Sequence, residues 1–367
     1  MPDAAGSGGG TAAGARGFQA GRAEPGRAGG TTLEDWESRA RAMLPAGAFD
    51  MMAGGSGCEQ TLRDNVEAWS RIRLRPRVLR DVSSLDTSVS VLTTSLAHPV
   101  LVAPVGYARL AHPDGEIAVA RGAREAGSLF VLSTRSSTPI EVVAEALAGS
   151  PWWFQVYVLA DRSRTVDFVQ RAREAGCGAL VLTADTPFPG SKPRNRRNGF
   201  ALPPAVQLAG ADPGAAQDRA VTPDDVSWLS ELADGLPVVV KGVLRADDAQ
   251  ICLQAGAAGI VVSNHGGRQL DGAVASADAL REVVEAVDGR AEVYVDGGIR
   301  SGTDVLRALA LGARAVLVGR PCLWGLAAAG AAGVAEVLGR LVAELEECMA
   351  LAGAPRLRDV TGDLVAR

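Results

Sequence analysis

The chain has 367 residues, of which 47% are hydrophobic and 22% charged, and its formal net charge is -5. This composition is typical of a folded globular protein, and the acidic balance excludes a domain-wide basic surface for nucleic acid. The five cysteines are scattered and form no C-x-x-C pair, so the sequence indicates neither a disulfide framework nor a metal site.

The N-terminal region divides into two parts. Residues 1–30 are Gly, Ala and Arg without periodicity, which predicts a disordered leader, and residues 31–367 are expected to form one domain. The segment from Thr31 to Leu44 has apolar residues at helical spacing and predicts an N-terminal helical extension. We find no signal peptide pattern and no apolar stretch that approaches the length of a membrane span. We therefore expect a cytoplasmic protein without a membrane partner.

Eight short apolar runs then alternate with helix-like segments, as in parallel strands joined by crossover helices. The runs are "PVLVAPVG", "LFVLST", "WFQVYV", "ALVLTADT", "PVVVKG", "GIVVSNHG", "EVYVDGG" and "AVLVGRP". Eight such units predict a closed (β/α)8 TIM barrel. An open doubly wound sheet is the alternative, but no G-x-G-x-x-G motif opens the first unit. Residues 187–221, rich in Pro, Gly, Arg and Asn, predict a long loop after strand 4.

Polar side chains end these apolar runs, and in such a barrel the carboxyl ends of the strands form the active-site face. Three runs end in pairs of residues two positions apart, which places both members on one face of the strand. The pairs are Gln155 with Tyr157, Thr183 with Asp185, and Ser263 with His265, while Lys241, Asp296 and Arg320 end three further runs.

Each of these candidates also has a structural interpretation. A lone histidine is usually a hydrogen-bonded core residue, but His265 lies beside glycines and Arg268, which favours function. Lys241 is costly to bury without a partner, so a negative ligand is favoured over packing. Asp185 could instead cap the turn "DTP", and Tyr157 could belong to the core; their positions on strand faces favour the site.

Two glycine-rich turns follow the seventh and eighth strands. "DGGIRSGTD" (296–304) frees backbone N–H groups before a predicted helix, and Arg300 adds positive charge there. "VGRP" (318–321) ends the next strand. One such turn is weak evidence, but two in adjacent units, at the place where barrels often bind phosphate, predict a phosphate site.

At this point the motifs show a family resemblance. "SNHGGRQLDG", "VVVKGV", "DGGIRSGTDVLRALALGARAVLVGRP", "FQVYV", "LTADTP" and "APVGYARLAHPDGE" together resemble the FMN-dependent 2-hydroxy acid oxidase and dehydrogenase family. Glycolate oxidase, lactate oxidase and mandelate dehydrogenase belong to it. The similarity runs from about Thr31 to the C-terminal region, and "AGGSG" and "RNGFALP" resemble the bacterial hydroxymandelate oxidases most.

The resemblance implies FMN as cofactor and oxidation of a small-molecule (S)-2-hydroxy acid to the 2-oxo acid, with electrons passed to oxygen or another acceptor. It implies a homo-oligomer, frequently a tetramer. His265 would accept the substrate's proton with Asp185 stabilising the imidazolium; Tyr157 would belong to the same site, and Arg268 would bind the substrate carboxylate. The implied cofactor contacts are Ala103, Pro104, Val105, Gly106, Ser133, Gln155, Thr183, Lys241, Ser263, Asp296, Gly298, Arg300, Gly319 and Arg320.

Three positions depart from the family pattern. Met51 stands where glycolate oxidase has a tyrosine, Arg135 replaces a tryptophan, and Lys192 takes the place of a second active-site arginine. We count these three as candidate substrate contacts. They suggest a substrate other than glycolate, larger or with a second polar or anionic group that meets Arg135, although Arg135 could also turn toward solvent. Gly106 lies where many family oxidases carry alanine, so the electron acceptor stays open.

Two alternative functions remain at the level of sequence. A different FMN barrel enzyme, such as a flavin-dependent isomerase, shares the phosphate elements and a lysine at a strand end, but does not need His265 paired with Arg268. A non-catalytic flavin-binding barrel would bind FMN without turning over any hydroxy acid.

Overall fold

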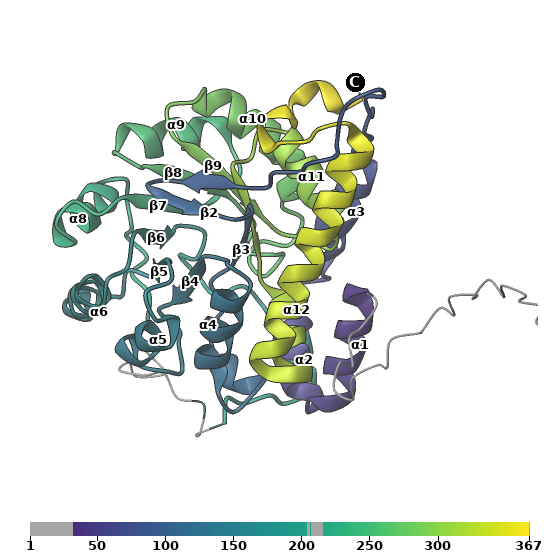
Figure 1. The fold of residues 1–367 in the computed structure, drawn as a ribbon. Coiled ribbons are helices and arrows are strands. Elements are labelled where there is room, and N and C mark those ends of the chain that lie inside the picture. Colours follow the sequence, from purple (N-terminus) through teal and green to yellow (C-terminus); the bar gives the residue numbers. More distant parts are fainter. Residues whose placement is uncertain (1–31, 204–205, 207–215, 367) are drawn as a thin grey trace, which may run out of the picture.

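The computed structural model describes residues 32–203, 206 and 216–366. Eight parallel strands close into a barrel in the order β10-β3-β4-β5-β6-β7-β8-β9 (Figure 1). They are β3 (Val100–Val102), β4 (Phe130–Ser133), β5 (Trp152–Val156), β6 (Leu180–Thr183), β7 (Val238–Val243), β8 (Gly259–Val262), β9 (Glu292–Asp296) and β10 (Ala315–Val318). Because β10 pairs with both β9 and β3, the predicted TIM barrel is confirmed and the open sheet is wrong.

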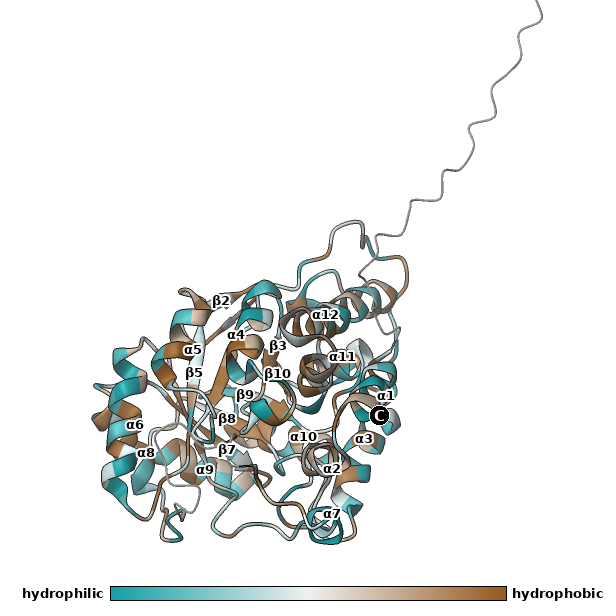
Figure 2. Ribbon diagram, turned by 90° about the horizontal axis from the view of Figure 1, so that it is seen from below, coloured by the Kyte–Doolittle hydropathy of each residue, from teal (hydrophilic) through white to brown (hydrophobic). Residues whose placement is uncertain are grey.

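A helix follows each barrel strand and covers the outside of the barrel, as the alternation of segments predicts. These helices are α4 (Gly115–Glu125), α5 (Ile140–Leu147), α6 (Arg162–Glu174), α8 (Asp224–Leu232), α9 (Ala246–Gln254), α10 (Ser276–Val287), α11 (Gly302–Ala310) and α12 (Arg320–Ala352). Figure 2 shows hydrophobic strands inside a ring of helices that carry hydrophilic residues.

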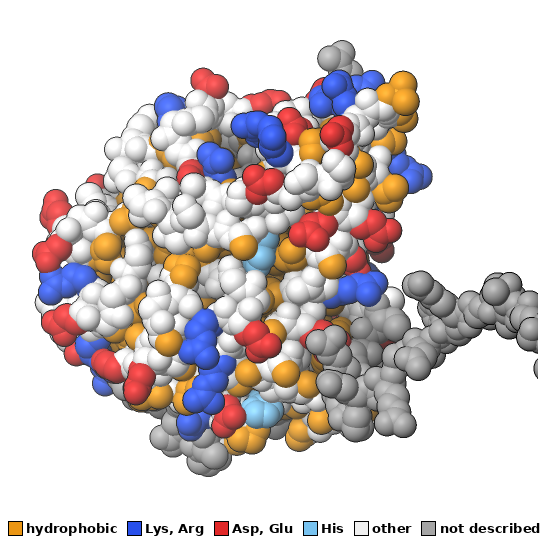
Figure 3. All heavy atoms as spheres, viewed as in Figure 1, with side chains coloured by type: hydrophobic (Ala, Val, Ile, Leu, Met, Phe, Trp, Pro, Cys, Tyr) orange, Lys and Arg blue, Asp and Glu red, His pale blue; other side chains and the backbone are white. Residues whose placement is uncertain are grey.

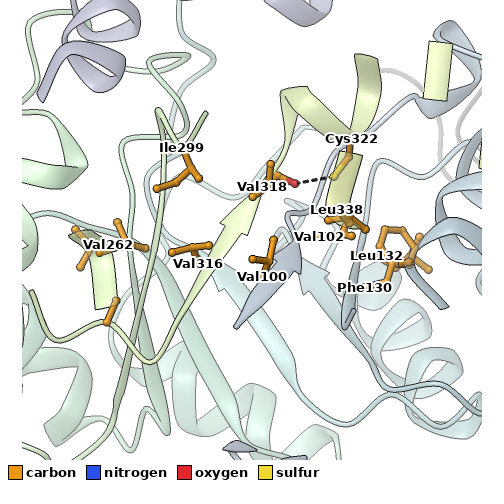
Figure 4. Close-up of a cluster of buried hydrophobic side chains, with 14 of the residues drawn as sticks. Val100, Val102, Phe130, Leu132, Val262, Ile299, Val316, Val318, Cys322 and Leu338 are labelled. Carbon is orange, nitrogen blue, oxygen red and sulfur yellow. Dashed lines mark hydrogen bonds between the residues drawn. The ribbon is translucent and has the colours of Figure 1, made fainter. Parts of the chain in front are cut away.

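Side chains alternate along each strand between the surrounding helices and the barrel interior. The outward side chains of β3 and β10, such as Val100 and Val318, share a buried cluster with Cys322 and Leu338 of α12 (Figure 4). The inward side chains form a second cluster of Leu101, Val131, Trp153, Val181, Val239, Val261, Tyr294 and Leu317. Burial on both faces explains why the strands read as continuous apolar runs.

The N-terminal extension consists of α1 (Leu33–Met43), α2 (Ala46–Ala53) and α3 (Gln60–Arg71). The predicted first helix is confirmed: Thr32 caps it, and its Oγ1 accepts a hydrogen bond from the backbone N of Asp35 at 3.2 Å. The predicted leader over residues 1–30 lies outside the described residues.

A two-stranded hairpin, which the sequence did not reveal, precedes the barrel. It comprises β1 (Val89–Val91) and β2 (Thr94–Leu96), which pair antiparallel. Val91 and Leu96 join the inward cluster of the barrel, and the backbone N of Leu92 donates to Glu292, the first residue of β9, at 2.9 Å. The hairpin therefore fills the end of the barrel where the strands begin.

The predicted long connection after the fourth barrel strand lies between β6 and α8 and includes the short helix α7 (Pro193–Arg197). Residues 204–205 and 207–215 of this connection lie outside the described part of the chain. The Nε2 atom of Gln269 donates to the backbone oxygens of Asp185 and Phe188, both at 2.9 Å. The connection is thus fastened to the loop after β8.

The long helix α12 is apolar and long enough to cross a membrane by length and composition, so the expectation that no such stretch exists is wrong. Its backbone leaves the helical conformation at Ala329 and Gly330. Leu323, Leu338 and Leu345 pack in the outer core of the barrel, where a core helix of a globular protein also meets this test. The described 3-10 helices are η1 (Ala108–Leu110), η2 (Leu357–Asp359) and η3 (Gly362–Leu364).

Acidic and basic side chains are interspersed over the face of the molecule shown in Figure 3, which agrees with the mixed charge of the sequence.

Candidate active site

A cavity of about 1090 Å³, its open mouth included, lies at the carboxyl ends of the barrel strands. The sequence-predicted residues that line it are Met51, Ala103, Pro104, Val105, Gly106, Ser133, Arg135, Gln155, Tyr157, Thr183, Lys241, His265, Arg268, Asp296, Gly298, Arg300, Gly319 and Arg320. Asp185, Lys192 and Ser263 do not line it. The lining residues that sequence reasoning missed include Met52, Tyr107, Ile299 and Leu323, whose apolar or aromatic side chains carry no signal of chemistry.

The floor of the cavity follows directly from the strand alternation. Each barrel strand places its next inward residue, two positions after the inward apolar one, at the carboxyl end. This ring consists of Ala103, Ser133, Gln155, Thr183, Lys241, Ser263, Asp296 and Gly319. Apolar layers therefore fill the barrel interior, and a mostly polar layer closes it under the cavity.

Within this ring, a chain of hydrogen bonds crosses three neighbouring strands. The Ser133 hydroxyl donates to Gln155 Oε1 at 3.0 Å, and Gln155 Nε2 donates to the Thr183 hydroxyl at 3.0 Å. All three side chains are buried. The amide of Gln155 is thus held with its carbonyl toward β4 and its amino group toward β6.

Lys241 forms the charged part of the ring. Its Nζ lies 3.0 Å from Asp296 Oδ2 and donates to the Ser263 hydroxyl at 2.7 Å. Burial works to lower the pKa of Lys241, but the carboxylates of Asp296 and Asp185 outweigh it and hold the pKa above its ordinary value. Lys241 therefore stays an ammonium. Ser263 was expected to meet the cofactor, but it lies beneath the cavity and positions Lys241.

A bulge in β7 brings Lys241 and Asp185 close together. The register of β7 on β8 shifts between Lys241 and Val243, and Gly242 between them has φ +111°. A Cβ atom at position 242 would lie 2.6 Å from the Cβ of Asp185, so only glycine fits this approach.

His265 and Asp185 form a hydrogen-bonded pair at the cavity wall. The Nδ1 atom of His265 lies 2.9 Å from Asp185 Oδ1, and Nε2 lies 3.5 Å from the Tyr157 hydroxyl. Burial works to raise the pKa of Asp185, but the imidazole of His265 and the charge of Lys241 hold it below its ordinary value. Asp185 therefore stays a carboxylate, and it acts on the side of the ring that faces away from the cavity.

The backbone that carries His265 is in the left-handed region, with φ 59° at His265 and positive φ at Gly266 and Gly267 as well. This turn is held by Asn264, whose side-chain oxygen accepts from the backbone N of Gly267 at 3.1 Å. A left-handed non-glycine residue costs free energy, and such strain is concentrated at functional sites.

Tyr157 and Arg268 complete the wall around His265. Burial raises the pKa of Tyr157 to about 12, with a further contribution from the charge of Asp185, so its hydroxyl stays protonated. The Nη1 atom of Arg268 donates to the backbone oxygens of Met51 and Gly54 at 2.8 and 2.9 Å. These two carbonyls of the N-terminal extension fix the plane of the Arg268 guanidinium at the cavity.

A second cationic group lies at the ends of β9 and β10. Arg320 begins α12 and donates from Nε to the backbone oxygen of Met52 at 3.2 Å. Burial, together with the charges of Arg268 and Arg300, lowers its pKa to about 9. Burial lowers the pKa of Arg300 too. Guanidinium groups gathered beside the N-terminus of a long helix form an anion-binding site.

Glycine keeps this cationic region open. A Cβ atom at position 266 would lie 2.9 Å from Nη1 of Arg320, and one at position 298 would lie 1.9 Å from the backbone oxygen of Asn65. The turn after β9 lies so close to α3 that position 298 must be glycine. Gly266, in contrast, leaves the guanidinium of Arg320 accessible.

Lys192 has a different position from the one expected of a substrate contact. Its Nζ donates to the Ser56 hydroxyl at 3.1 Å and also to the backbone oxygen of Arg268. Burial lowers the pKa of Lys192 to about 7, with further lowering by the charges of Arg268 and Arg320. Arg194, its neighbour in sequence, pairs with Glu59 at 2.5 Å. Both side chains fasten the connection after β6 to the extension.

Arg135 lines the cavity, so the alternative in which it points away into solvent is not the one observed. Its guanidinium carbon lies 5.8 Å from the centre of the Tyr157 ring. Across residues 32–203, 206 and 216–366, no group of three or more His, Cys, Asp or Glu side chains is placed to hold a metal ion.

Comparison with known proteins gives a consistent result. The FMN-dependent dehydrogenase family model matches residues 40–367. The chain is 49% identical to 4-hydroxymandelate oxidase of Amycolatopsis orientalis, over 88% of this chain and 94% of the relative. It is 47% identical to L-lactate oxidase of Nostoc sp., over 89% of this chain and 96% of the relative. It is 41% identical to 2-hydroxyacid oxidase 1 of Homo sapiens, over 91% of this chain and 96% of the relative.

Solved structures agree with the sequence relatives. A crystal structure of mandelate oxidase superimposes with a TM-score of 0.87 at 47% identity, covering 91% of this chain and 97% of that one. Since the family model spans nearly the whole barrel and the relatives exceed 40% identity over most of both chains, the chain belongs to the FMN-dependent dehydrogenase family.

Proposed function

We propose that this chain oxidises a 2-hydroxy acid to the 2-oxo acid with FMN as its cofactor, and that His265 and Arg268 carry the substrate chemistry. One observation carries the assignment of roles: a carboxylate-paired imidazole and a fixed guanidinium line the same cavity. An imidazole can take up a proton, and a guanidinium matches the geometry of a carboxylate.

The residues of the cavity fit FMN. The polar ring offers both acceptors and donors to a flat heteroaromatic ring, and Lys241 supplies a positive charge at its edge. Asp296 Oδ1 is buried without a hydrogen-bond partner among the described residues, which suits a donor on a ligand. Arg300, Arg320 and the N-terminus of α12 suit a phosphate.

When bound, FMN would accept the hydrogen of carbon 2 together with its bonding pair of electrons. The protein's own residues perform the other tasks. Arg268 binds the substrate carboxylate and so sets the position of carbon 2. His265 Nε2 accepts the hydroxyl proton, and Asp185 stabilises the imidazolium that results. The Tyr157 hydroxyl, which stays protonated, lies 3.5 Å from Nε2 and offers a hydrogen-bond donor to the substrate at this point.

We further propose that glycolate is not the preferred substrate. Met51, Tyr107 and Arg135 line the cavity together with Tyr157, so the wall offers both apolar and charged surface to a substituent on carbon 2. Glycolate has no such substituent and would leave this surface without contact.

The direct test follows the absorbance of the purified, FMN-loaded protein without air. Glycolate, lactate, mandelate and 2-hydroxy dicarboxylates are added separately, and loss of the flavin absorbance reports electron transfer. We expect at least one of them to reduce the flavin, with glycolate slow. A yellow protein that none of these acids reduces would contradict the proposed function, and fast reduction by glycolate would contradict the substrate proposal alone.

The electron acceptor is tested by mixing the reduced protein with oxygen. Rapid recovery of the flavin absorbance identifies an oxidase, and slow recovery identifies another acceptor.

We also propose that the protein is a homo-oligomer in the cytoplasm. Light scattering of the eluted protein measures the mass of the particle against the 37.7 kDa chain.

A further inference from the structure

The cavity carries a second guanidinium on the substrate side. Arg135 and Arg268 both lie within electrostatic reach of the Tyr157 hydroxyl, and both lower its pKa against the effect of burial. Arg135 comes from the loop after β4, whereas Arg268 comes from the loop after β8. A substrate that binds beside Tyr157 therefore comes within electrostatic reach of two arginine side chains, which follow two different strands.

The side chains that line the cavity are mostly cationic among the charged ones. Five cationic residues line it, Arg135, Lys241, Arg268, Arg300 and Arg320, against one carboxylate, Asp296. Carboxylates behind the wall balance part of this charge, since Asp185 acts on Lys241, and Glu37 acts on both Arg300 and Arg320. The cationic lining still favours an anionic substituent over a neutral one, because opposite charges attract in a partly buried site.

The loop that carries Arg135 is held firmly. The carboxylate of Glu116, which is 1% exposed, accepts from the backbone N of Ser137 at 2.9 Å and of Ala108 at 3.0 Å, and from the Thr138 hydroxyl at 2.9 Å. It joins the loops after β3 and β4. A guanidinium on a fixed loop loses less entropy when it binds a ligand.

Gly106 and Arg135 fit each other. The backbone N of Tyr107 donates to the backbone oxygen of Arg135 at 2.9 Å. A Cβ atom at position 106 would lie 2.5 Å from the Cβ of Arg135 and 3.0 Å from its backbone oxygen. An alanine at position 106 would therefore displace the base of the Arg135 side chain. Glycine at position 106 and the departure at Arg135 are thus coupled by contact.

From these observations we infer that the substrate is a 2-hydroxy dicarboxylate whose second carboxylate binds Arg135. This inference rests on the proposed function and specifies its substrate class. Arg268 holds the carboxylate next to carbon 2, and Arg135 holds the remote one, so that the diacid lies across Tyr157 and His265. A guanidinium binds a carboxylate through two parallel hydrogen bonds, and this geometry selects the diacid over a monoacid of equal length.

The test compares acids of five carbons that differ only in the remote group. In FMN-loaded protein without air, the change in flavin absorbance gives the dissociation constants of 2-oxoglutarate and 2-oxovalerate. Reduction of the flavin by (S)-2-hydroxyglutarate and (S)-2-hydroxyvalerate gives the matching rates. We expect the diacid to be favoured by about 10- to 100-fold in both measurements, as for a hydrogen-bonded charge pair. Equal values, or a preference for the monoacid, would overturn the inference.

Variants assign the preference to Arg135. Arg135→Gln should reduce the ratio of diacid to monoacid to near unity, and Arg135→Lys should retain part of it, because the charge remains without the fork. Arg109→Gln, an exposed cation outside the cavity wall, is the matched control and should keep the ratio. Gly106→Ala should lower the ratio although it removes no charge. A ratio that survives Arg135→Gln would overturn the inference even if the diacid is preferred.

The outcomes separate the two proposals. If the monoacid reduces the flavin and the diacid has no advantage, the dicarboxylate inference fails and the proposed function stands. If neither acid reduces the flavin, and no other 2-hydroxy acid does, the proposed function fails and this inference fails with it.

Discussion

His265 depends on a single partner for its orientation and for the charge that it acquires. Asp185 does not line the cavity itself but is hydrogen-bonded to Nδ1 of the His265 ring, which does. Asp185→Asn keeps the shape but removes the negative charge that stabilises the imidazolium. We expect the rate of flavin reduction by substrate, measured by stopped flow without air, to fall by about 10²- to 10⁴-fold, the usual contribution of acid–base catalysis.

The matched control is Asp167→Asn, since Asp167 is an exposed carboxylate on α6. In the Asp167→Asn protein the substrate should reduce the flavin at the wild-type rate. An Asp185→Asn protein that does the same would show that proton transfer does not depend on this pair.

Lys192 predicts a dependence of stability on pH. Its pKa is about 7 in the folded chain, mainly through burial, against 10.5 for an unperturbed lysine. Between these two values the unfolded chain holds more protons at this position than the folded chain does. The free energy of unfolding therefore rises with pH across this window.

Lys192→Met removes the titrating group and should remove this rise. The measurement is the difference in free energy of unfolding between wild type and variant, from denaturant titrations at several pH values between neutrality and the ordinary lysine pKa. The wild type should gain on the variant as pH increases. A constant difference would contradict the lowered pKa.

At the scale of elements, the turn that carries His265 is locked to the N-terminal extension by two asparagines. Asn65 of α3 and Asn264 after β8 exchange two side-chain hydrogen bonds, both of 2.8 Å, and both residues are buried. Asn65→Ala removes both bonds and also leaves the buried backbone N of Ser276 without the acceptor that Asn65 Oδ1 provides. We expect a loss of about 1–3 kcal/mol in the free energy of unfolding, the cost of an unsatisfied buried polar group.

The double variant Asn65→Ala/Asn264→Ala tests the coupling. Because each single substitution already removes the two mutual hydrogen bonds, the two losses should not add. Additive losses in denaturant titrations would show that the pair contributes no mutual interaction.

The elements also explain which parts of the site could be predicted. Alternation along a strand places Gln155, Thr183 and Lys241 on the inward face, and this period can be read from sequence. The position of Lys192 could not be predicted, because it depends on how the connection after β6 folds over Arg268. The same holds for Tyr107 and Leu323, which meet the cavity only through tertiary packing.

The β1–β2 hairpin was missed for a related reason. Its strands have three residues each, with serine and threonine between the apolar ones, so they do not stand out as an apolar run. The family motifs, in contrast, lie at the strand ends, and they made the barrel, the cofactor and the family predictable before the fold was known.

For the whole molecule, the arginines at the ends of β9 and β10 link folding to the cofactor. A ligand that binds only the folded chain stabilises it in proportion to its affinity. FMN should therefore raise the melting temperature of the cofactor-free protein, and riboflavin, which lacks the phosphate, should raise it much less. Differential scanning calorimetry measures both shifts.

Arg320→Met gives the complementary result. Without a ligand the variant should be at least as stable as wild type, because a partly buried cation beside Arg268 and Arg300 is unfavourable, as its lowered pKa shows. It should lose most of the extra stabilisation by FMN over riboflavin. A variant that keeps the full difference would place the phosphate elsewhere.

The hairpin at the far end of the barrel also bears on whether the product leaves before the flavin is reoxidised. Because apolar layers fill the barrel and Val91 and Leu96 cover its base, the acid and the electron acceptor must share the opening at the carboxyl ends of the strands. A large electron carrier cannot enter while the acid occupies this opening, whereas oxygen is small enough to pass beside it. The oxidised acid must therefore leave before a large electron acceptor can reoxidise the flavin, whereas reoxidation by a small acceptor depends less on its release.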